Sequence, residues 1–188
     1  MMTRLSSPLL LMVGLVAFQV AQAQVKPTPL AFVPACDLQE LNREYVTALN
    51  YVRHQLDPNA PTVRFDPALF VLTVLHAVEM QRTDSLYHAS APSLRYAAEL
   101  IGTKHSMQSP DVKKLVNFML TSLQNSEPHC EFQSNTKLVY VAIAAAHDYY
   151  AVRLSDTPSV VYTNEQAAFA DLGVKYEIPA KLIRRLGL

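Results

Sequence analysis

The sequence contains little glycine, almost no cysteine and no tryptophan: four Gly, two Cys and no Trp in 188 residues. It has no P-loop, GxGxxG, GxSxG or HExxH motif, and so few glycines leave no glycine-rich loop for cradling a phosphate. Only 17% of the residues are charged, and the 16 basic side chains are balanced by 16 acidic ones. A protein held on nucleic acid by phosphate contacts needs a basic surface. The sequence therefore gives no support to the best-known nucleotide-binding, hydrolase and zinc-protease motifs, and it predicts no nucleic-acid partner.

Apolar residues make up half of the chain, and its length suits one domain with a sizeable core. The N-terminus has the three parts of a secretory signal: Arg4, an apolar run over residues 9–18, and the small residues of Ala21-Gln22-Ala23. The run is too short to span a bilayer. We therefore expect a signal peptide over residues 1–23 and a secreted protein, extracellular or periplasmic, with no transmembrane segment after cleavage. An uncleaved N-terminal anchor is the alternative.

The rest of the chain begins with a lead-in and then shows helical periodicity. Residues 24–36 hold three prolines and no helical period, which predicts an extended segment. Asp37, Asp66 and Asp111 each precede apolar residues spaced three and four apart, the pattern of a capped amphipathic helix. These patterns predict helices over residues 37–56, 67–82 and 111–123.

The segments between and after these helices lack the helical spacing of apolar residues. Residues 93–102 allow a short helix or turn, and residues 125–130 break the helix that precedes them. Residues 137–154 are rich in Val, Ile, Tyr and Ala and predict a β-hairpin. Beyond residue 155 the signal weakens, with a short helix possible from Thr163. Helices followed by a hairpin predict an α+β fold.

Two of the six histidines lie where a scaffold offers side chains to a cleft. His88 and His129 each follow an apolar helix in a predicted loop, and Glu99 is a lone carboxylate in an otherwise apolar stretch. Two imidazoles and a carboxylate could bind a zinc-like divalent ion or share protons. His54 and His76 lie within helical stripes and are interpreted as ordinary helix residues.

The predicted export bears on the oxidation state of the two cysteines. Outside the cytosol thiols oxidise, so Cys36 and Cys130 are predicted to form one long-range disulfide. Free thiols, or Cys130 acting as a nucleophile, are the alternatives. No CxxC pair is present, which excludes a cysteine-based zinc site.

The order of several short segments resembles the CAP superfamily, the SCP-domain proteins that include cysteine-rich secretory, antigen 5 and pathogenesis-related-1 proteins. Residues 49–53 resemble its hNxxR helix, and residues 63–69 its pLxWDxxL segment with Phe65 in place of Trp. Further on, residues 86–90 match LxHs, residues 98–101 stand at GENI, and residues 126–129 resemble the SxxH of bacterial members.

This resemblance implies a three-layer α-β-α sandwich over residues 37–154, followed by a C-terminal extension over residues 155–188. It also implies a cleft that holds His88, His129 and Glu99, where some relatives bind zinc or another divalent ion. Besides Phe65, the departures from the pattern include Ala98-Glu99-Leu100 in place of GEN and the lack of an acid between Asp111 and Glu127 to serve as the second cleft acid.

Three hypotheses follow. The leading one is an exported, monomeric, non-enzymatic CAP-like domain that binds a divalent metal such as zinc, a lipid, or an envelope partner through the His/Glu cleft. The second is a metal-assisted hydrolase in which His88 and His129 hold the ion and Glu99 is the general base. The third is a secreted helical interaction or inhibitor protein unrelated to the CAP superfamily.

Overall fold

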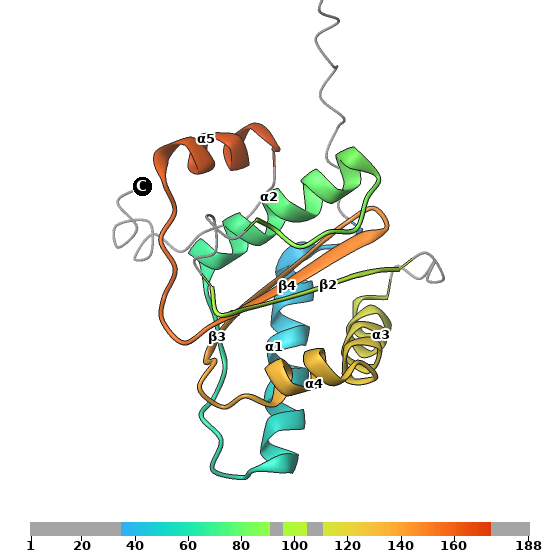
Figure 1. The fold of residues 1–188 in the computed structure, drawn as a ribbon, viewed down its shortest axis with the longest axis vertical. Helices are drawn as coiled ribbons and strands as arrows, with labels where there is room; N and C mark the ends of the chain where they lie inside the picture. The colour runs from blue at the N-terminus through green and yellow to red at the C-terminus, as the bar shows by residue number, and fades with distance from the viewer. Residues whose placement is uncertain (1–34, 91–95, 105–110, 174–188) are drawn as a thin grey trace, which may run out of the picture.

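The computed structural model describes residues 35–90, 96–104 and 111–173, and the predicted signal peptide lies outside these ranges. The elements in chain order are α1 (Leu38–Leu56), β1 (Arg64–Phe65), α2 (Pro67–Thr83), β2 (Ala98–Thr103), α3 (Val112–Gln124), α4 (Glu127–Ser134), β3 (Tyr140–Ala146), β4 (Tyr149–Ser155) and α5 (Thr163–Asp171). They are shown in Figure 1.

The strands form one mixed sheet in the order β1-β3-β4-β2. β3 and β4 are the predicted hairpin, which is confirmed, with Ile143 opposite Val152. β2 pairs antiparallel with the other edge of β4, which sets Glu99 opposite Arg153. The short β1 pairs in parallel with β3. The chain is therefore an α+β fold, as predicted.

Helices cover both faces of this sheet. α2 packs on β3 and β4 and carries α5 on its outer side, whereas α1 packs on β3 from the opposite face together with α3 and α4 (Figure 1). Phe169 of α5 meets Phe70 of α2 edge to face, with ring centroids 5.9 Å apart. The three layers are those of the predicted α-β-α sandwich.

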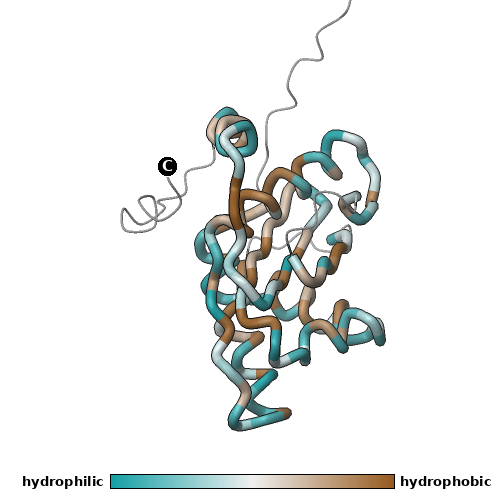
Figure 2. Tube along the Cα trace, turned by 60° about the vertical axis from the view of Figure 1, so that its left-hand side comes forward, coloured by the Kyte–Doolittle hydropathy of each residue, from teal (hydrophilic) through white to brown (hydrophobic). Residues whose placement is uncertain are grey.

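The central strands are buried along their whole length because both faces of the sheet are covered. Every residue of β4 and all but the first of β3 are buried, so these strands are apolar without alternation except for Arg153 and Ser155 of β4. Figure 2 shows hydrophobic segments gathered in the interior of the fold and hydrophilic ones at its periphery. Ala144, Ala145 and Ala146 keep this part of β3 small, so the covering helices can approach it closely.

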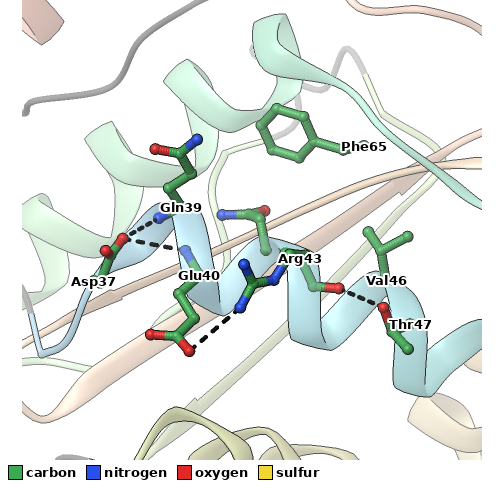
Figure 3. Close-up of a pocket in the computed structure, with 8 residues that line it drawn as sticks. Asp37, Gln39, Glu40, Arg43, Val46, Thr47 and Phe65 are labelled. Carbon is green, nitrogen blue, oxygen red and sulfur yellow. Dashed lines mark hydrogen bonds and ion pairs between the residues drawn. The ribbon is translucent and has the colours of Figure 1, made fainter.

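The three long helices begin at the predicted Asp caps. Asp37, Asp66 and Asp111 each accept hydrogen bonds from the two amides that lie two and three residues further on, and Figure 3 shows those of Asp37. Such a cap contributes about 1 kcal/mol to helix stability. The second oxygen of Asp66 also accepts a bond from Ser159 N at 2.8 Å, which ties the chain after β4 to the start of α2.

Two local predictions differ from the structure. Residues 98–103 form strand β2, not a helix or turn, because their backbone pairs with β4 along one edge and the four residues from Ala98 to Ile101 are buried on both sides of the strand. The break after α3 is confined to Asn125 and Ser126, since a new helix, α4, begins at Glu127 with Pro128 in its first turn.

The predicted disulfide is wrong, because Cys36 and Cys130 are both free thiols. Cys36 precedes the first turn of α1, whereas Cys130 lies on α4, which is hydrogen-bonded to Arg53 in the last turn of α1. A helix of 19 residues spans roughly 28 Å, and a disulfide requires Cα atoms only about 6 Å apart. Burial, with a smaller contribution from Asp37, raises the pKa of Cys36 to about 11, so its thiol stays protonated at neutral pH.

No helix within residues 35–90, 96–104 and 111–173 combines the length and the apolar character that a membrane crossing requires.

Replacing Gly102 by Ala should destabilise the fold. A Cβ at this position would overlap the phenol ring of Tyr150, which is itself buried and has little room to move. We expect a loss of about 1–3 kcal/mol in the free energy of unfolding, measured by urea denaturation. In a Tyr150→Leu background the same substitution should cost less, and an equal cost in both backgrounds would contradict this explanation.

Candidate functional site

Glu99 is the centre of a buried polar cluster on the α2 side of the sheet. Its side chain is only 4% exposed, and both of its oxygens are occupied. Oε1 accepts bonds from Arg153 Nε at 2.9 Å and from Tyr96 Oη at 3.0 Å, and it lies 2.8 Å from Arg153 Nη2. Oε2 accepts from Ala89 N at 2.9 Å and faces His88 Nδ1 at 3.1 Å. The carboxylate is therefore fully coordinated by protein donors.

Arg153 holds this carboxylate in its ionised form. It reaches Glu99 from the neighbouring strand β4, and its guanidinium also stacks on the Tyr96 ring, 4.3 Å from the centroid. Burial alone would raise the pKa of Glu99, but the charge and hydrogen bonds of Arg153, together with the Ala89 amide, outweigh it and lower that pKa. Glu99 is therefore a weak base that accepts hydrogen bonds without taking up the proton.

His88 is the exposed end of the cluster. It lies in the loop after α2, and its side chain is 60% exposed although it contacts the buried Glu99. An ionised carboxylate is only an acceptor, so Nδ1 of His88 must donate. In a neutral imidazole Nε2 then carries the lone pair. A histidine that gives its other N–H to a carboxylate is the arrangement found in metal-binding sites.

His76 holds the loop that carries His88. Its Nε2 donates to the carbonyl of Tyr87 at 2.9 Å and lies 3.7 Å from Glu99 Oε1. The His76 ring also packs edge to face on the Tyr87 ring. Burial lowers the pKa of His76 more strongly than the nearby Glu99 raises it, so the ring is neutral at neutral pH. His76, on α2, thus holds the loop at Tyr87, the residue before His88.

His129 comes from α4, which packs with α1 and α3. It lies in the first turn of that helix, not in a loop, and it is partly buried. Burial lowers the pKa of His129, and the charge that His88 can carry lowers it further. The structure thus brings His88 and Glu99 into direct contact, and it places His129 on a separate element, α4.

The donor set limits what kind of metal site this could be. Within the part of the chain that the structure describes, no three His, Cys, Asp or Glu side chains are arranged to hold an ion together. Two imidazoles, one of them oriented by Glu99, nevertheless fit the nitrogen ligands that zinc and related ions prefer. Such an ion would complete its coordination with water.

A groove of about 710 Å³ along the first half of α1 is a separate feature (Figure 3). Its polar side chains already serve the helix: Asp37 caps it, Glu40 pairs with Arg43 at 3.4 Å, and Thr47 donates to the Arg43 carbonyl. The charges in this groove are thus used locally, and it has none of the histidine chemistry found around Glu99.

Sequence reasoning missed three members of the cluster: Arg153, His76 and Tyr96. Arg153 had a detectable signal, because a lone charge within the apolar second strand of a hairpin requires a partner. His76 was interpreted as an ordinary helix residue, and only the path of the loop after α2 reveals its contacts. Tyr96 had no distinguishing pattern.

Breaking the buried ion pair from one side should cost more than removing it whole. Glu99→Leu alone leaves the buried charge of Arg153 unpaired, and Arg153→Met alone leaves the buried charge of Glu99 unpaired. Each single variant should lower the free energy of unfolding by about 3–5 kcal/mol. The double variant should be more stable than the sum of the single losses predicts. Urea denaturation of the four proteins measures this coupling, and strictly additive losses would contradict it.

The fold should lose stability as the pH falls below about 6.5. Because burial lowers the pKa values of His76 and His129, the unfolded state binds protons first, and acidification favours it. Glu99, whose pKa is also lowered, adds a further loss once the pH falls through about 4.5, its ordinary value. His76→Gln keeps a donor for Tyr87 and should reduce the slope of melting temperature against pH near pH 6. His147→Asn, at an exposed turn, serves as the control and should leave that slope unchanged; equal slopes in all three proteins would contradict the assignment.

Comparison with known proteins gives a match in structure only, since no family model and no curated protein matches the sequence. An outer surface protein from Borrelia burgdorferi matches with a TM-score of 0.50 at 15% identity, over 63% of this chain and 93% of that one. An extracellular protein with an SCP domain from Bacillus anthracis gives a TM-score of 0.49 at 18% identity, over 63% and 41% of the two chains. A cysteine-rich secretory protein from Staphylococcus aureus gives a TM-score of 0.38 at 13% identity, over 62% and 40%.

The chain thus spans less than half the length of the Bacillus and Staphylococcus proteins. At these identities the likeness concerns the fold. At that level the chain shares its fold, as a divergent match, with the Borrelia outer surface protein, and the two lower-scoring neighbours are described as an SCP-domain protein and a cysteine-rich secretory protein, the family that the sequence resembles.

Proposed function

We propose that this protein is an exported, non-enzymatic CAP-like domain that binds a divalent cation through the imidazoles of His88 and His129. One observation carries the proposal: the buried Glu99, ionised by Arg153, points its Oε2 at Nδ1 of the exposed His88. This contact leaves Nε2 of His88 as the ring atom that would bind the ion, and His129 would supply the second imidazole. When bound, the ion would be a charge held at the protein surface, with water completing its coordination.

The same geometry disfavours the hydrolase hypothesis. A general base must be able to take a proton from water, but Glu99 accepts from four different residues and has a lowered pKa. Its side chain is also buried beneath the loop that carries His88 and Ala89. Glu99 is therefore better suited to orienting His88 than to activating a water molecule.

Among the binding partners considered, the metal has the most direct support. The exposed chemistry at the site is an imidazole nitrogen with an available lone pair, and nitrogen ligands of this kind select zinc, copper, nickel or iron. The export part of the proposal rests on the signal-like residues 1–23 and on the structural neighbours described as extracellular or outer-surface proteins.

Zinc titration by calorimetry, in a buffer that does not bind metal, tests this function. The parent should bind one equivalent, and His88→Ala or His129→Ala should each weaken binding at least about tenfold because one of two protein ligands is lost. The double variant Glu99→Leu/Arg153→Met removes the acceptor that orients His88 and should weaken binding about 10- to 100-fold. His147→Asn is the matched control and should bind like the parent.

Absence of binding by the parent would overturn the metal function. Binding that survives both histidine variants unchanged would place the ion elsewhere. A hydrolase screen with the zinc-loaded protein addresses the alternative, and an activity that Glu99→Gln abolishes while the protein stays folded would favour an enzyme.

A further inference from the structure

Arg53 is a buried cation held by backbone carbonyls. Its side chain projects from the last turn of α1 and the residue is only 1% exposed. Its Nε donates to the carbonyl of Gln133 and its Nη1 to the carbonyl of Leu138, both at 2.7 Å. Within the described ranges no carboxylate forms an ion pair with it. Burial lowers its pKa, which shows that the surroundings disfavour the charge.

This arrangement is expensive for the fold. Nη2 of Arg53 and Oε1 of Gln133 are both buried and have no hydrogen-bond partner among the residues that the structure describes. Unpaired buried polar atoms destabilise a protein, and an uncompensated buried charge does so more strongly. A side chain kept only to fill the core would do so better without a charge, so the two bonds that Arg53 makes need a separate explanation.

Those two bonds bracket the connection between α4 and β3. Gln133 is in the last turn of α4, where carbonyls lack partners within the helix and favour a cation, and Leu138 lies two residues before β3. A helix of eight residues has little stability of its own. The only other α1 side chain bonded to α4 among the described residues is that of Tyr45, whose Oη accepts from Gln133 Nε2 at 3.1 Å.

We infer that Arg53 is a positioning residue for the metal site: by clamping Gln133 and Leu138 to α1, it fixes α4 and so sets where His129 stands relative to His88. The inference rests on the proposed function for its ligand. Its structural half, the clamp on α4, can be tested even if no metal binds.

Arg53→Met tests the inference against a matched control on the same helix. Asn42 is also buried and also forms hydrogen bonds from α1 to the backbone of another element. These bonds go to N and O of Ile143 in β3, whereas those of Arg53 go to the end of α4 and the segment before β3. Arg53→Met should weaken zinc binding by about as much as His129→Ala, and should add no further loss when His129 is already Ala. Asn42→Ala should lower the melting temperature but bind zinc like the parent.

Hydrogen exchange supplies the readout that needs no metal. Arg53→Met should speed amide exchange selectively in residues 127–139, whereas Asn42→Ala should not. If Arg53→Met does not fold, Arg53→Lys replaces it, because a lysine keeps the charge but cannot hold both carbonyls in the geometry of a guanidinium.

The outcomes separate cleanly. Unchanged exchange in residues 127–139, or equal zinc losses in the Arg53 and Asn42 variants, would overturn the role of Arg53. A parent that binds no zinc, combined with selective exchange in the Arg53 variant, would overturn the proposed function and leave the clamp standing.

Discussion

The buried ion pair between Glu99 and Arg153 is the interaction on which the site depends. It joins neighbouring strands β2 and β4 at opposed positions, so sheet register determines whether it forms. Each partner is almost fully buried and would be costly alone, which makes the pair a strict condition on the fold. Tyr96, Ala89 and His88 complete the coordination of the carboxylate. A group that must satisfy so many neighbours has a fixed position and a fixed charge.

That fixed carboxylate decides the chemistry available at the surface. Glu99 orders the loop after α2 through the amide of Ala89 and the ring of His88, while His76 holds the same loop through Tyr87. The result is an oriented, exposed imidazole above a buried anion. Structure and site are therefore not independent, because the ion pair that joins β2 to β4 also orients His88.

Much of this could be predicted from local sequence signals. The Asp caps and apolar periodicity located α1, α2 and α3, and the β-branched and aromatic run located the hairpin, since these features act over a few residues. Strand β2 could not be located, because its residues have no strand alternation when both sides are buried. The prediction of a Cys36–Cys130 disulfide was wrong for a related reason. It rested on the oxidising environment outside the cytosol, whereas a bond depends on where the two cysteines lie, and these lie toward opposite ends of α1. Arg153 became a partner of Glu99 only through strand register.

The tautomer of His88 tests the central claim most directly. Long-range ¹H–¹⁵N NMR, at a pH where imidazoles are neutral, reports which ring nitrogen carries the proton. If Glu99 is an ionised acceptor that orients this ring, the proton resides on Nδ1 and Nε2 is bare. A proton on Nε2 would mean that Glu99 does not accept from His88, and the account of the site would be wrong.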